Sequence, residues 1–364
     1  MSGPSFVRAL RGALLAACLV MGPLVGLGTA QAQAQAQTGT PYPARPEVQS
    51  LIEELVTQHG FDRARLGRWF AAARYSPTVE RLMQPPIPFG QRNWYDYRDR
   101  YLDAARVQAG LAFWRANSAA LARAQDEYGV PPQYVVAIIG VETFYGRITG
   151  NFRTLDALMT LSFDYPRRAD FYRAELTQFL LLAREQGANP LAYKGSYAGA
   201  IGLPQFMPGS IRRWAVDFDG NGRIDLADSP ADAIGSVASF LAAHGWQRDW
   251  PVLAEASASE EIVDALGRGI VAQTPWSSAL YAGLESEISL PLDAPVLVID
   301  LPVIDAGGQP AREYRVGTAS FSALLHYNRS YFYATAVTEL AAEIALRKNT
   351  DASSSPEPNK RSPP

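Results

Sequence analysis

The chain has 364 residues, 48% of them hydrophobic, which is enough to bury a large core in one elaborated domain or in two to three smaller lobes. Its formal net charge is −3, so the composition excludes the basic footprint of a nucleic-acid-binding protein. We therefore expect no nucleic-acid partner, and we expect the mature protein to be a monomer.

Residues 1–37 are expected to be an export signal rather than part of the fold. Arg8 and Arg11 form a short basic segment, residues 13–27 are apolar, and an Ala-Gln repeat follows. This order is typical of a cleaved secretory signal peptide, so we predict a periplasmic protein. No later segment of the sequence is apolar enough to span a membrane.

The only cysteine, Cys18, leaves two forms of the exported protein open. The sequence "LAAC", which ends at Cys18, resembles a bacterial lipobox and would make this residue a lipidated N-terminus and a membrane tether. The apolar run continues past Cys18 to Leu27, however, and cleavage at Cys18 would leave that run on the mature protein. Soluble export is favoured, and in both forms the mature fold contains no disulfide.

Helices are predicted over most of the first third of the mature chain. Residues 38–46 are expected to be a Pro-rich linker, and residues 47–128 an additional helical lobe. The first helix, "PEVQSLIEELVTQHG", starts at a proline and stops at a glycine. A single long helix is predicted over 105–129.

The region from about 129 to 248 is expected to be a helical core. Pro131 and Pro132 suit the first turn of a helix that carries the apolar run Val135–Val141. Two more helices are predicted over 168–187 and 229–245, and Ser229 is a suitable N-cap for the second.

Two strands interrupt the helical pattern in a small β-rich lobe over about 250–318. The segment "APVLVIDLPVIDAGGQPAREYRVG", residues 294–317, predicts two strands joined by a Gly-Gly turn. A helix over about 320–348 returns to the core, and residues 349–364 are expected to be a disordered tail. The predicted fold class is therefore α+β and mainly α-helical.

The segment "DFDGNGRIDLAD", residues 217–228, matches the spacing of an EF-hand calcium loop. Alternate side chains of such a loop converge on a hard cation, and Gly222 permits the sharp turn. Position 12 holds Asp228 rather than Glu, so either Asp228 or Asp232 could close the site. The alternative is an acidic turn without an ion, and a single loop favours a structural Ca²⁺ over a calcium sensor. The predicted ligands within the loop 217–232 are Asp217, Asp219, Asn221, Arg223 (through its backbone carbonyl), Asp228 and Asp232.

A single carboxylate, Glu142, ends the apolar segment "VVAIIGVETFYG". A carboxyl group at the end of an apolar helix loses hydration, which raises its pKa and keeps it protonated near neutral pH. Such a group suits general acid catalysis at a glycosidic oxygen. The structural alternative is a buried glutamate that pairs with an arginine.

Three further motifs carry polar residues, and each has a structural alternative. The Gly-rich segment "GSYAGAIGLPQFMPGS", residues 195–210, has glycines that allow close approach either to a ligand or to another element. Arg167 and Arg168 open a helix, where they would also serve as solvated charges. Asn328 precedes a long helix, where it would also serve as an N-cap. The three histidines are scattered, so no transition-metal site is expected.

Read together, six segments in this order resemble the lytic murein transglycosylase B family. They are "IIGVETFYG", "LSFDYPRRADFY", "GSYAGAIGLPQFMP", "DFDGNGRIDL", "AIGSVASFLAAHGW" and "YNRSYFYATAV". The resemblance extends from about Pro46 to about Arg347 and is weakest over 250–315. It implies a lysozyme-like catalytic core and an enzyme that cuts peptidoglycan, with glycan strands as its binding partner.

The resemblance also implies that Glu142 is the catalytic residue. It would protonate the oxygen between N-acetylmuramic acid (MurNAc) and N-acetylglucosamine (GlcNAc), and then take the proton of the C6 hydroxyl, which closes a 1,6-anhydro ring without water. The implied glycan-site residues are Tyr97, Arg167, Arg168, Ser196, Gln205, Tyr327, Asn328 and Tyr333. One alternative is a hydrolytic muramidase, which would use a second carboxylate such as Asp156, Asp164 or Asp170. Another is a non-catalytic, calcium-stabilised wall-binding protein.

Overall fold

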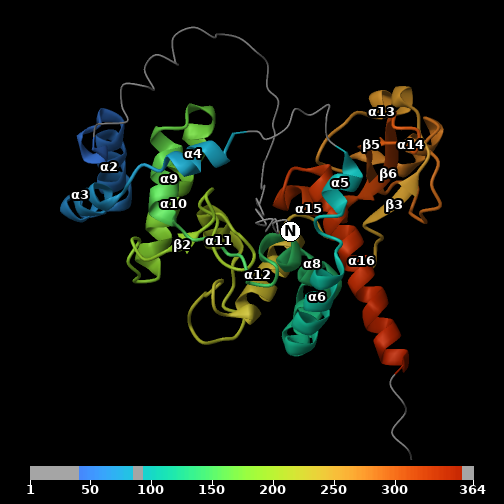
Figure 1. Ribbon diagram of the computed structural model, residues 1–364, viewed down its shortest axis with the longest axis horizontal. Helices are drawn as coiled ribbons and strands as arrows, with labels where there is room; N and C mark the ends of the chain where they lie inside the picture. The colour runs from blue at the N-terminus through green and yellow to red at the C-terminus, as the bar shows by residue number, and fades with distance from the viewer. Residues whose placement is uncertain (1–40, 85–92, 355–364) are drawn as a thin grey trace, which may run out of the picture.

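The computed structural model describes residues 41–84 and 93–354. The helices in chain order are η1 (Tyr42–Ala44), α2 (Pro46–His59), α3 (Arg63–Ala72), α4 (Pro77–Leu82), α5 (Trp94–Arg98), α6 (Ala104–Ala116), α7 (Ser118–Tyr128), α8 (Pro132–Thr143), α9 (Thr154–Phe163), η3 (Pro166–Arg168), α10 (Ala169–Glu185), α11 (Pro208–Trp214), α12 (Pro230–Ala243), α13 (Glu260–Leu266), α14 (Trp276–Tyr281), α15 (Ala319–Tyr327) and α16 (Tyr331–Ser354). Figure 1 shows α2 and α3 at one end of the molecule and a small sheet at the other, with α8 between them. The predicted signal peptide and Cys18 lie outside the described residues.

The segment expected to be a free linker, 38–46, packs on the helical core where it is described. Tyr42 and Arg45 are buried. The Tyr42 hydroxyl donates to Asp164 Oδ2 at 2.6 Å, and Arg45 Nη1 lies 2.7 Å from Asp164 Oδ1. The Pro-rich composition gave no sign of these contacts, because their partner lies far along the chain.

The helices between residues 47 and 128 do not form one separate lobe, contrary to the prediction. The helix α4 packs against α9, whereas α6 packs against α8 and α16, and α7 packs against α12. These helices therefore divide between two sides of the core. Local periodicity predicted that the helices exist but could not predict which neighbour each would cover.

The predicted single helix over 105–129 is two helices, α6 and α7. Asn117 leaves the helical conformation with a φ of −119°, and its side-chain amide donates to Phe113 O at 2.8 Å. An asparagine side chain that bonds the backbone of the preceding turn competes with continuation of the helix.

The helix α8 lies in the middle of the hydrophobic core, and every residue from Val135 to Thr143 is buried. Pro132 occupies its first position, as predicted. The predicted helices that became α10 and α12 are also present, and Ser229 caps α12 by accepting the backbone N–H of Asp232 at 3.2 Å.

A four-stranded antiparallel sheet forms the other end of the molecule. Its strands, in spatial order, are β3 (Leu253–Ala256), β6 (Pro310–Thr318), β5 (Pro295–Ile304) and β4 (Thr274–Pro275). The two long strands, β5 and β6, are the predicted hairpin. Ile299 and Leu301 of β5 face the main core, whereas Val296 and Val298 face a second core with Trp276 of α14. A two-stranded ribbon, β1 (Phe152–Arg153) with β2 (Lys194–Gly195), lies beside the Gly-rich loop.

The C-terminal helix α16 buries the face that the sequence predicted. The side chains of Tyr333, Val337, Leu340, Ala341 and Ile344 are all buried. The helix continues to Ser354, so the expectation of disorder from residue 349 is wrong as far as that residue. Among the described residues, no helix is both long enough and apolar enough to cross a membrane.

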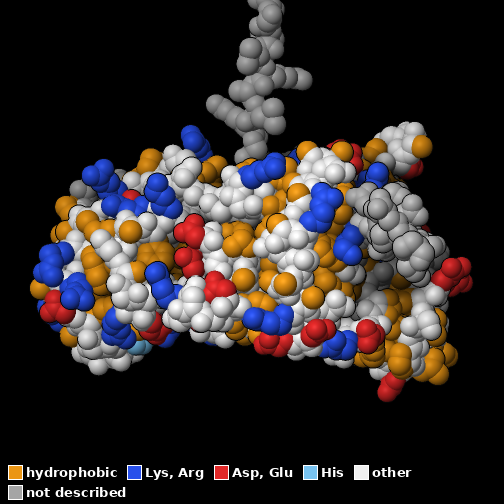
Figure 2. All heavy atoms as spheres, turned by 90° about the horizontal axis from the view of Figure 1, so that it is seen from below, with side chains coloured by type: hydrophobic (Ala, Val, Ile, Leu, Met, Phe, Trp, Pro, Cys, Tyr) orange, Lys and Arg blue, Asp and Glu red, His pale blue; other side chains and the backbone are white. Residues whose placement is uncertain are grey.

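The surface carries both signs of charge. Figure 2 shows Lys and Arg side chains gathered most densely toward the end formed by α2 and α3, with Asp and Glu side chains among them. The mainly helical α+β class predicted from the sequence is the class observed.

Candidate active site

Glu142 lies in the last turn of α8, where the helix ends abruptly. Phe144 and Tyr145 both have positive φ values, 50° and 58°. Left-handed backbone is costly for bulky side chains and persists only where the surroundings enforce it, which is common at functional sites. The turn therefore fixes the path of the main chain directly after Glu142 and Thr143.

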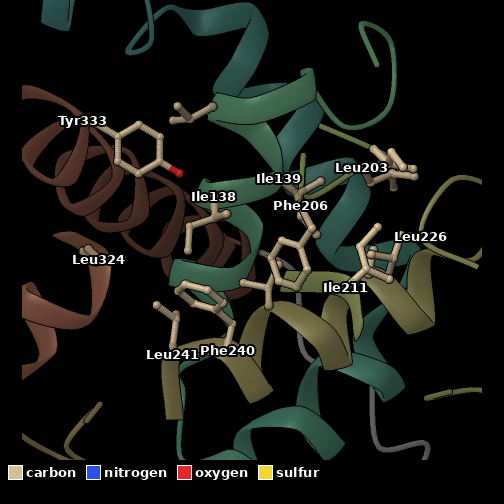
Figure 3. Close-up of a cluster of buried hydrophobic side chains, with 14 of the residues drawn as sticks. Ile138, Ile139, Leu203, Phe206, Ile211, Leu226, Phe240, Leu241, Leu324 and Tyr333 are labelled. Atoms are coloured by element: carbon tan, nitrogen blue, oxygen red, sulfur yellow. The ribbon is translucent and has the colours of Figure 1, made fainter. Parts of the chain in front are cut away.

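The Glu142 carboxyl group is buried, with 8% of the residue exposed. Its Oε1 accepts a hydrogen bond from the Tyr333 hydroxyl at 2.6 Å. Burial raises the pKa of Glu142 to about 7, and the hydrogen bond from Tyr333 opposes this shift. In Figure 3 the Tyr333 hydroxyl points from α16 toward α8. A carboxyl group with this pKa is both an acid and a base near neutral pH.

Four tyrosines, Tyr97, Tyr101, Tyr327 and Tyr333, surround Glu142, and we call them the tyrosine cluster. Burial raises the pKa of each hydroxyl, and the nearby charge of Glu142 raises it further. The rings of Tyr97 and Tyr101 lie 5.1 Å apart, and those of Tyr327 and Tyr333 stack 6.3 Å apart at 13°. The cluster gives the site aromatic walls and neutral hydroxyl groups, which suit a sugar.

No Arg or Lys forms an ion pair with Glu142 within the described part of the chain, so the arginine-paired alternative is not observed. The three candidates for a second carboxylate have other partners. Asp164 pairs with Arg45 at 2.7 Å, Asp156 with Arg153 at 2.6 Å and Asp170 with Arg173 at 2.7 Å. Among the described residues, Glu142 is the only carboxylate whose charge acts on the tyrosine cluster.

The Gly-rich loop carries Ser196 and Gln205. The Gln205 backbone has a φ of 50°, and its side-chain amide donates to Gly202 O at 2.8 Å and to Thr149 O at 3.1 Å. Ser196 Oγ accepts the backbone N–H of Ala200 at 3.1 Å. These bonds fix the loop internally and also join Gln205 to the segment that follows α8, through Thr149 O.

Two members of the predicted site, Tyr327 and Asn328, end α15. The Tyr327 hydroxyl donates to Pro204 O and so joins α15 to the Gly-rich loop. Asn328 does not cap α16 as the structural alternative supposed, because Ser330 Oγ accepts the N–H of Tyr333 at 3.3 Å. Asn328 Oδ1 is buried and has no hydrogen-bond partner among the described residues, which is uncommon for a buried polar atom.

Arg167 and Arg168 lie in η3, which contacts α9 and α10. The Arg168 guanidinium lies over the rings of Phe171, at 4.3 Å, and Tyr172, at 5.6 Å. These contacts hold the Arg168 side chain against α10.

The acidic loop 217–232 brings three of its carboxylates together. Oxygens of Asp217, Asp219 and Asp232 lie within 4.8 Å of one another. Asp232 is fully buried and accepts the backbone N–H groups of Phe218, Asp219 and Asp225 at 2.7, 3.1 and 2.8 Å. Carboxylate oxygens at this spacing fit a Ca²⁺ ion, which prefers such ligands.

The remaining predicted ligands shape the same loop. Asn221 Oδ1 accepts the N–H of Arg223 at 2.9 Å, and Asp217 Oδ1 accepts the N–H of Asn221 at 3.1 Å. Asp228 is not part of the carboxylate group, and its own N–H donates to Asp225 Oδ1 at 2.9 Å. Of the two residues considered for closing the site, Asp232 is the one that meets Asp217 and Asp219.

The sequence reasoning missed two residues of the site. Tyr101 belongs to the tyrosine cluster, and its signal was its place four residues after Tyr97 in "YDYRDRY". Thr143 directly follows Glu142, and its hydroxyl contacts Leu203 O of the Gly-rich loop at 2.9 Å. Nothing in the local sequence distinguished that hydroxyl from an ordinary helix threonine.

Comparison with known proteins gives consistent matches over most of the chain. The family model described as "Transglycosylase SLT domain" matches residues 43–342. The chain is 40% identical to the membrane-bound lytic murein transglycosylase B of Escherichia coli, in an alignment that covers 85% of this chain and 86% of that protein. It resembles the structure of the catenated lytic transglycosylase SltB1 from Pseudomonas aeruginosa with a TM-score of 0.78 and 42% identity, over 84% of this chain and 99% of that one. It also resembles the E. coli lytic transglycosylase Slt35 in complex with calcium, with a TM-score of 0.74 and 40% identity, over 86% and 97% of the two chains.

Proposed function

The chain belongs to the transglycosylase SLT family and is a peptidoglycan lytic transglycosylase with a lysozyme-like fold, and we propose that Glu142 is its single catalytic carboxylate. The observation that carries this assignment is the burial of Glu142 among four tyrosines with one hydrogen-bond donor and no cationic partner in the described chain. With a pKa of about 7, such a carboxyl group keeps a large protonated fraction at neutral pH and can give its proton to a substrate.

Glu142 gives its proton to the glycosidic oxygen between MurNAc and GlcNAc. As the bond from C1 of MurNAc to that oxygen breaks, the positive charge is shared by C1 and the ring oxygen in an oxocarbenium-like intermediate or is taken up by the acetamido oxygen. The Glu142 carboxylate then takes the proton of the C6 hydroxyl, and that oxygen forms the 1,6-anhydro bond to C1. The proton balance closes on one residue, so the cleavage needs neither water nor a second carboxylate.

The glycan strand is held by groups around this carboxyl. We assign the walls of the site to Tyr97, Tyr327 and Tyr333, and polar contacts to Ser196, Gln205 and Asn328. Support comes from the buried Oδ1 of Asn328, which has no hydrogen-bond partner among the described residues. Arg167 and Arg168 lie in η3, and their guanidinium groups suit the carboxylates of peptide stems.

The products of digestion test this function. Intact sacculi treated with the enzyme are expected to release muropeptides with 1,6-anhydro-MurNAc ends. Because no water is added in the cleavage, these products are about 18 Da lighter than the products of hydrolysis. Mass spectrometry distinguishes the alternatives directly. Reducing-end muropeptides would support a hydrolytic muramidase, and intact glycan would support a wall-binding protein without catalysis.

The acidic loop is assigned a structural Ca²⁺ ion held by Asp217, Asp219 and Asp232, with Asn221 and the Arg223 carbonyl completing the loop side. The support is the convergence of the three carboxylates and the calcium complex of the related Slt35. The ion would neutralise the carboxylates and join the loop to α12, and it takes no part in proton transfer at Glu142.

The enzyme acts in the bacterial envelope, in keeping with its membrane-bound E. coli relative. We assign it to the periplasm as a monomer, exported by residues 1–37, with a lipid anchor at Cys18 as the alternative. The mass of the mature N-terminus decides between the two forms, because only a lipidated Cys18 carries the diacylglyceryl group.

A further inference from the structure

Thr143, the last residue of α8, is fully buried, and its one hydroxyl proton has two carbonyl acceptors within reach, the nearer of which is Leu203 O. Its Oγ1 lies 2.9 Å from Leu203 O and 3.2 Å from Ile139 O, and it accepts the N–H of Gly146 at 3.1 Å. One hydroxyl thus contacts its own helix, the left-handed turn after Glu142, and the Gly-rich loop.

The part of the Gly-rich loop that Thr143 contacts is fixed from several sides. The N–H of Leu203 donates to Leu226 O in the acidic loop at 2.8 Å, and the next carbonyl, Pro204 O, accepts the Tyr327 hydroxyl. A Cβ on Gly202 would lie 2.4 Å from Leu226 O, so the two backbones approach as closely as they can. Figure 3 shows Leu203 and Leu226 next to each other. The loop backbone is therefore a rigid reference to which α8 can be attached.

The two sides that Thr143 joins both carry strained backbone next to a functional side chain. Phe144 and Tyr145 follow Glu142 with positive φ values, and Gln205 has a φ of 50°. Such conformations persist only where neighbouring contacts over-determine them. The Thr143 hydroxyl supplies such contacts on both sides, to Gly146 and to Leu203.

We infer that Thr143 is a positioning residue, whose hydroxyl sets the Glu142 carboxyl relative to Gln205 by fastening the end of α8 to the Gly-rich loop. The inference rests on the proposed roles of Glu142 and Gln205. Thr143 itself touches neither reacting atom, so it acts through the placement of Glu142.

The test is Thr143→Val, which keeps the shape of the side chain and removes the hydroxyl, compared with Thr143→Ser, which keeps the hydroxyl. Turnover is measured on soluble, peptide-bearing glycan oligomers of defined length. We expect Thr143→Val to lower kcat by about tenfold, with KM changed by less than about twofold, because misplacing a catalytic group costs rate more than binding. Thr143→Ser is expected to restore kcat.

A second readout follows the carboxyl group itself. Loosening the end of α8 admits water to Glu142, and burial is the main cause of its raised pKa. The alkaline limb of the kcat–pH profile should therefore move to lower pH in Thr143→Val. The groups that face Glu142 in the described chain are the four tyrosines of the cluster, which stay neutral over this range, so the limb reports Glu142.

Thr318→Val is the matched control. Thr318 is also fully buried, donates to the backbone carbonyl of a distant segment, Pro251 O, at 2.8 Å, and accepts a backbone N–H, from Ser320, at 3.2 Å. Its loss should lower the melting temperature as much as that of Thr143 without moving the pH profile.

Two results would overturn the inference: a Thr143→Val enzyme with unchanged kcat and pH profile, or one whose changes Thr318→Val reproduces. If Thr143→Val does not fold, Thr143→Ala is measured in its place against the same control. Failure of the proposed function would be seen elsewhere, as normal turnover in Glu142→Gln, and so is distinguishable from failure of this inference.

Discussion

Two buried carboxylates, Glu142 at the end of α8 and Asp232 at the start of α12, differ in the hydrogen-bond donors around them. The difference separates a proposed catalytic group from a structural one. Asp232 is fully buried and accepts three backbone N–H groups, which satisfy it and draw the acidic loop around it. Glu142 is buried and, within the described part of the chain, has a single hydrogen-bond donor, the Tyr333 hydroxyl. Burial alone therefore does not make a catalytic acid, because the number and kind of donors decide whether the proton stays available.

The largest expected effect comes from removing the acid at Glu142. Glu142→Gln keeps the shape of the side chain and should lower turnover by roughly 10²–10⁴-fold, the usual contribution of a general acid, while glycan binding is retained. The measurement is release of anhydro-muropeptides from sacculi together with a sacculus-binding assay. Near-normal turnover would reject the assignment.

Glu175→Gln is the control for burial. Glu175 is also a buried carboxylate, and it accepts the N–H of Gly209 at 2.7 Å. A glutamine keeps an oxygen to accept that bond, so turnover should stay near that of the wild type.

The next prediction concerns stability against pH. The pKa of Glu142 is raised to about 7, above that of an exposed glutamate, so the folded state binds this proton more tightly than the unfolded state. The stability that this provides is complete below pH about 4.5, the ordinary pKa, and is lost as the pH rises to about 7, with a total of about 3 kcal/mol. Urea unfolding at pH 5 and pH 8 should show a smaller difference in Glu142→Gln. An equal difference in the two proteins would contradict the raised pKa.

Calcium should act on the acidic loop and leave the chemistry at Glu142 largely intact. An ion that binds only the folded state stabilises it by about 2.7 kcal/mol at a hundredfold excess over Kd. We therefore expect calcium to raise the melting temperature and a chelator to lower it. Well below melting, turnover should survive chelation, because the N–H bonds to Asp232 still hold the loop.

Asp217→Ala removes one of the three converging carboxylates and should abolish the calcium-dependent shift. If neither calcium nor a chelator changes the melting temperature of the wild-type protein, the result would count against the site. Loss of turnover while the protein is still folded would instead count against a purely structural ion.

The smallest expected effect comes from the one donor at Glu142. Tyr333→Phe removes a hydrogen bond that opposes the raised pKa, so the pKa of Glu142 should rise further and the alkaline limb of the activity profile should move to higher pH. A hydrogen bond to a charged group contributes about 1.5–3 kcal/mol, so turnover should fall by at least about tenfold. If the limb moves to lower pH instead, water has entered the space left by the hydroxyl and hydrates the Glu142 carboxylate, which would contradict this prediction.

The sequence alone determined the elements whose causes are local. The apolar run before Glu142, the prolines at the start of α8, the Ser229 cap and the Gly-Gly hairpin each act within a few residues, so their helices and strands formed as predicted. The order of six motifs was enough to indicate the family, which the matches over most of the chain confirm. Burial of Glu142 was also expected, because it follows the uncharged apolar run Val135–Val141.

Only the tertiary structure decided which distant groups meet. It packed the expected linker against Asp164, divided the expected helical lobe between two sides of the core, and chose Asp232 over Asp228 as the third carboxylate of the acidic loop. It also brought Tyr333 to Glu142 across 191 positions of the chain and Thr143 to Leu203 across 60. Periodicity and capping report on neighbours within one or two turns, whereas these contacts depend on how whole helices pack, and no local pattern encodes that.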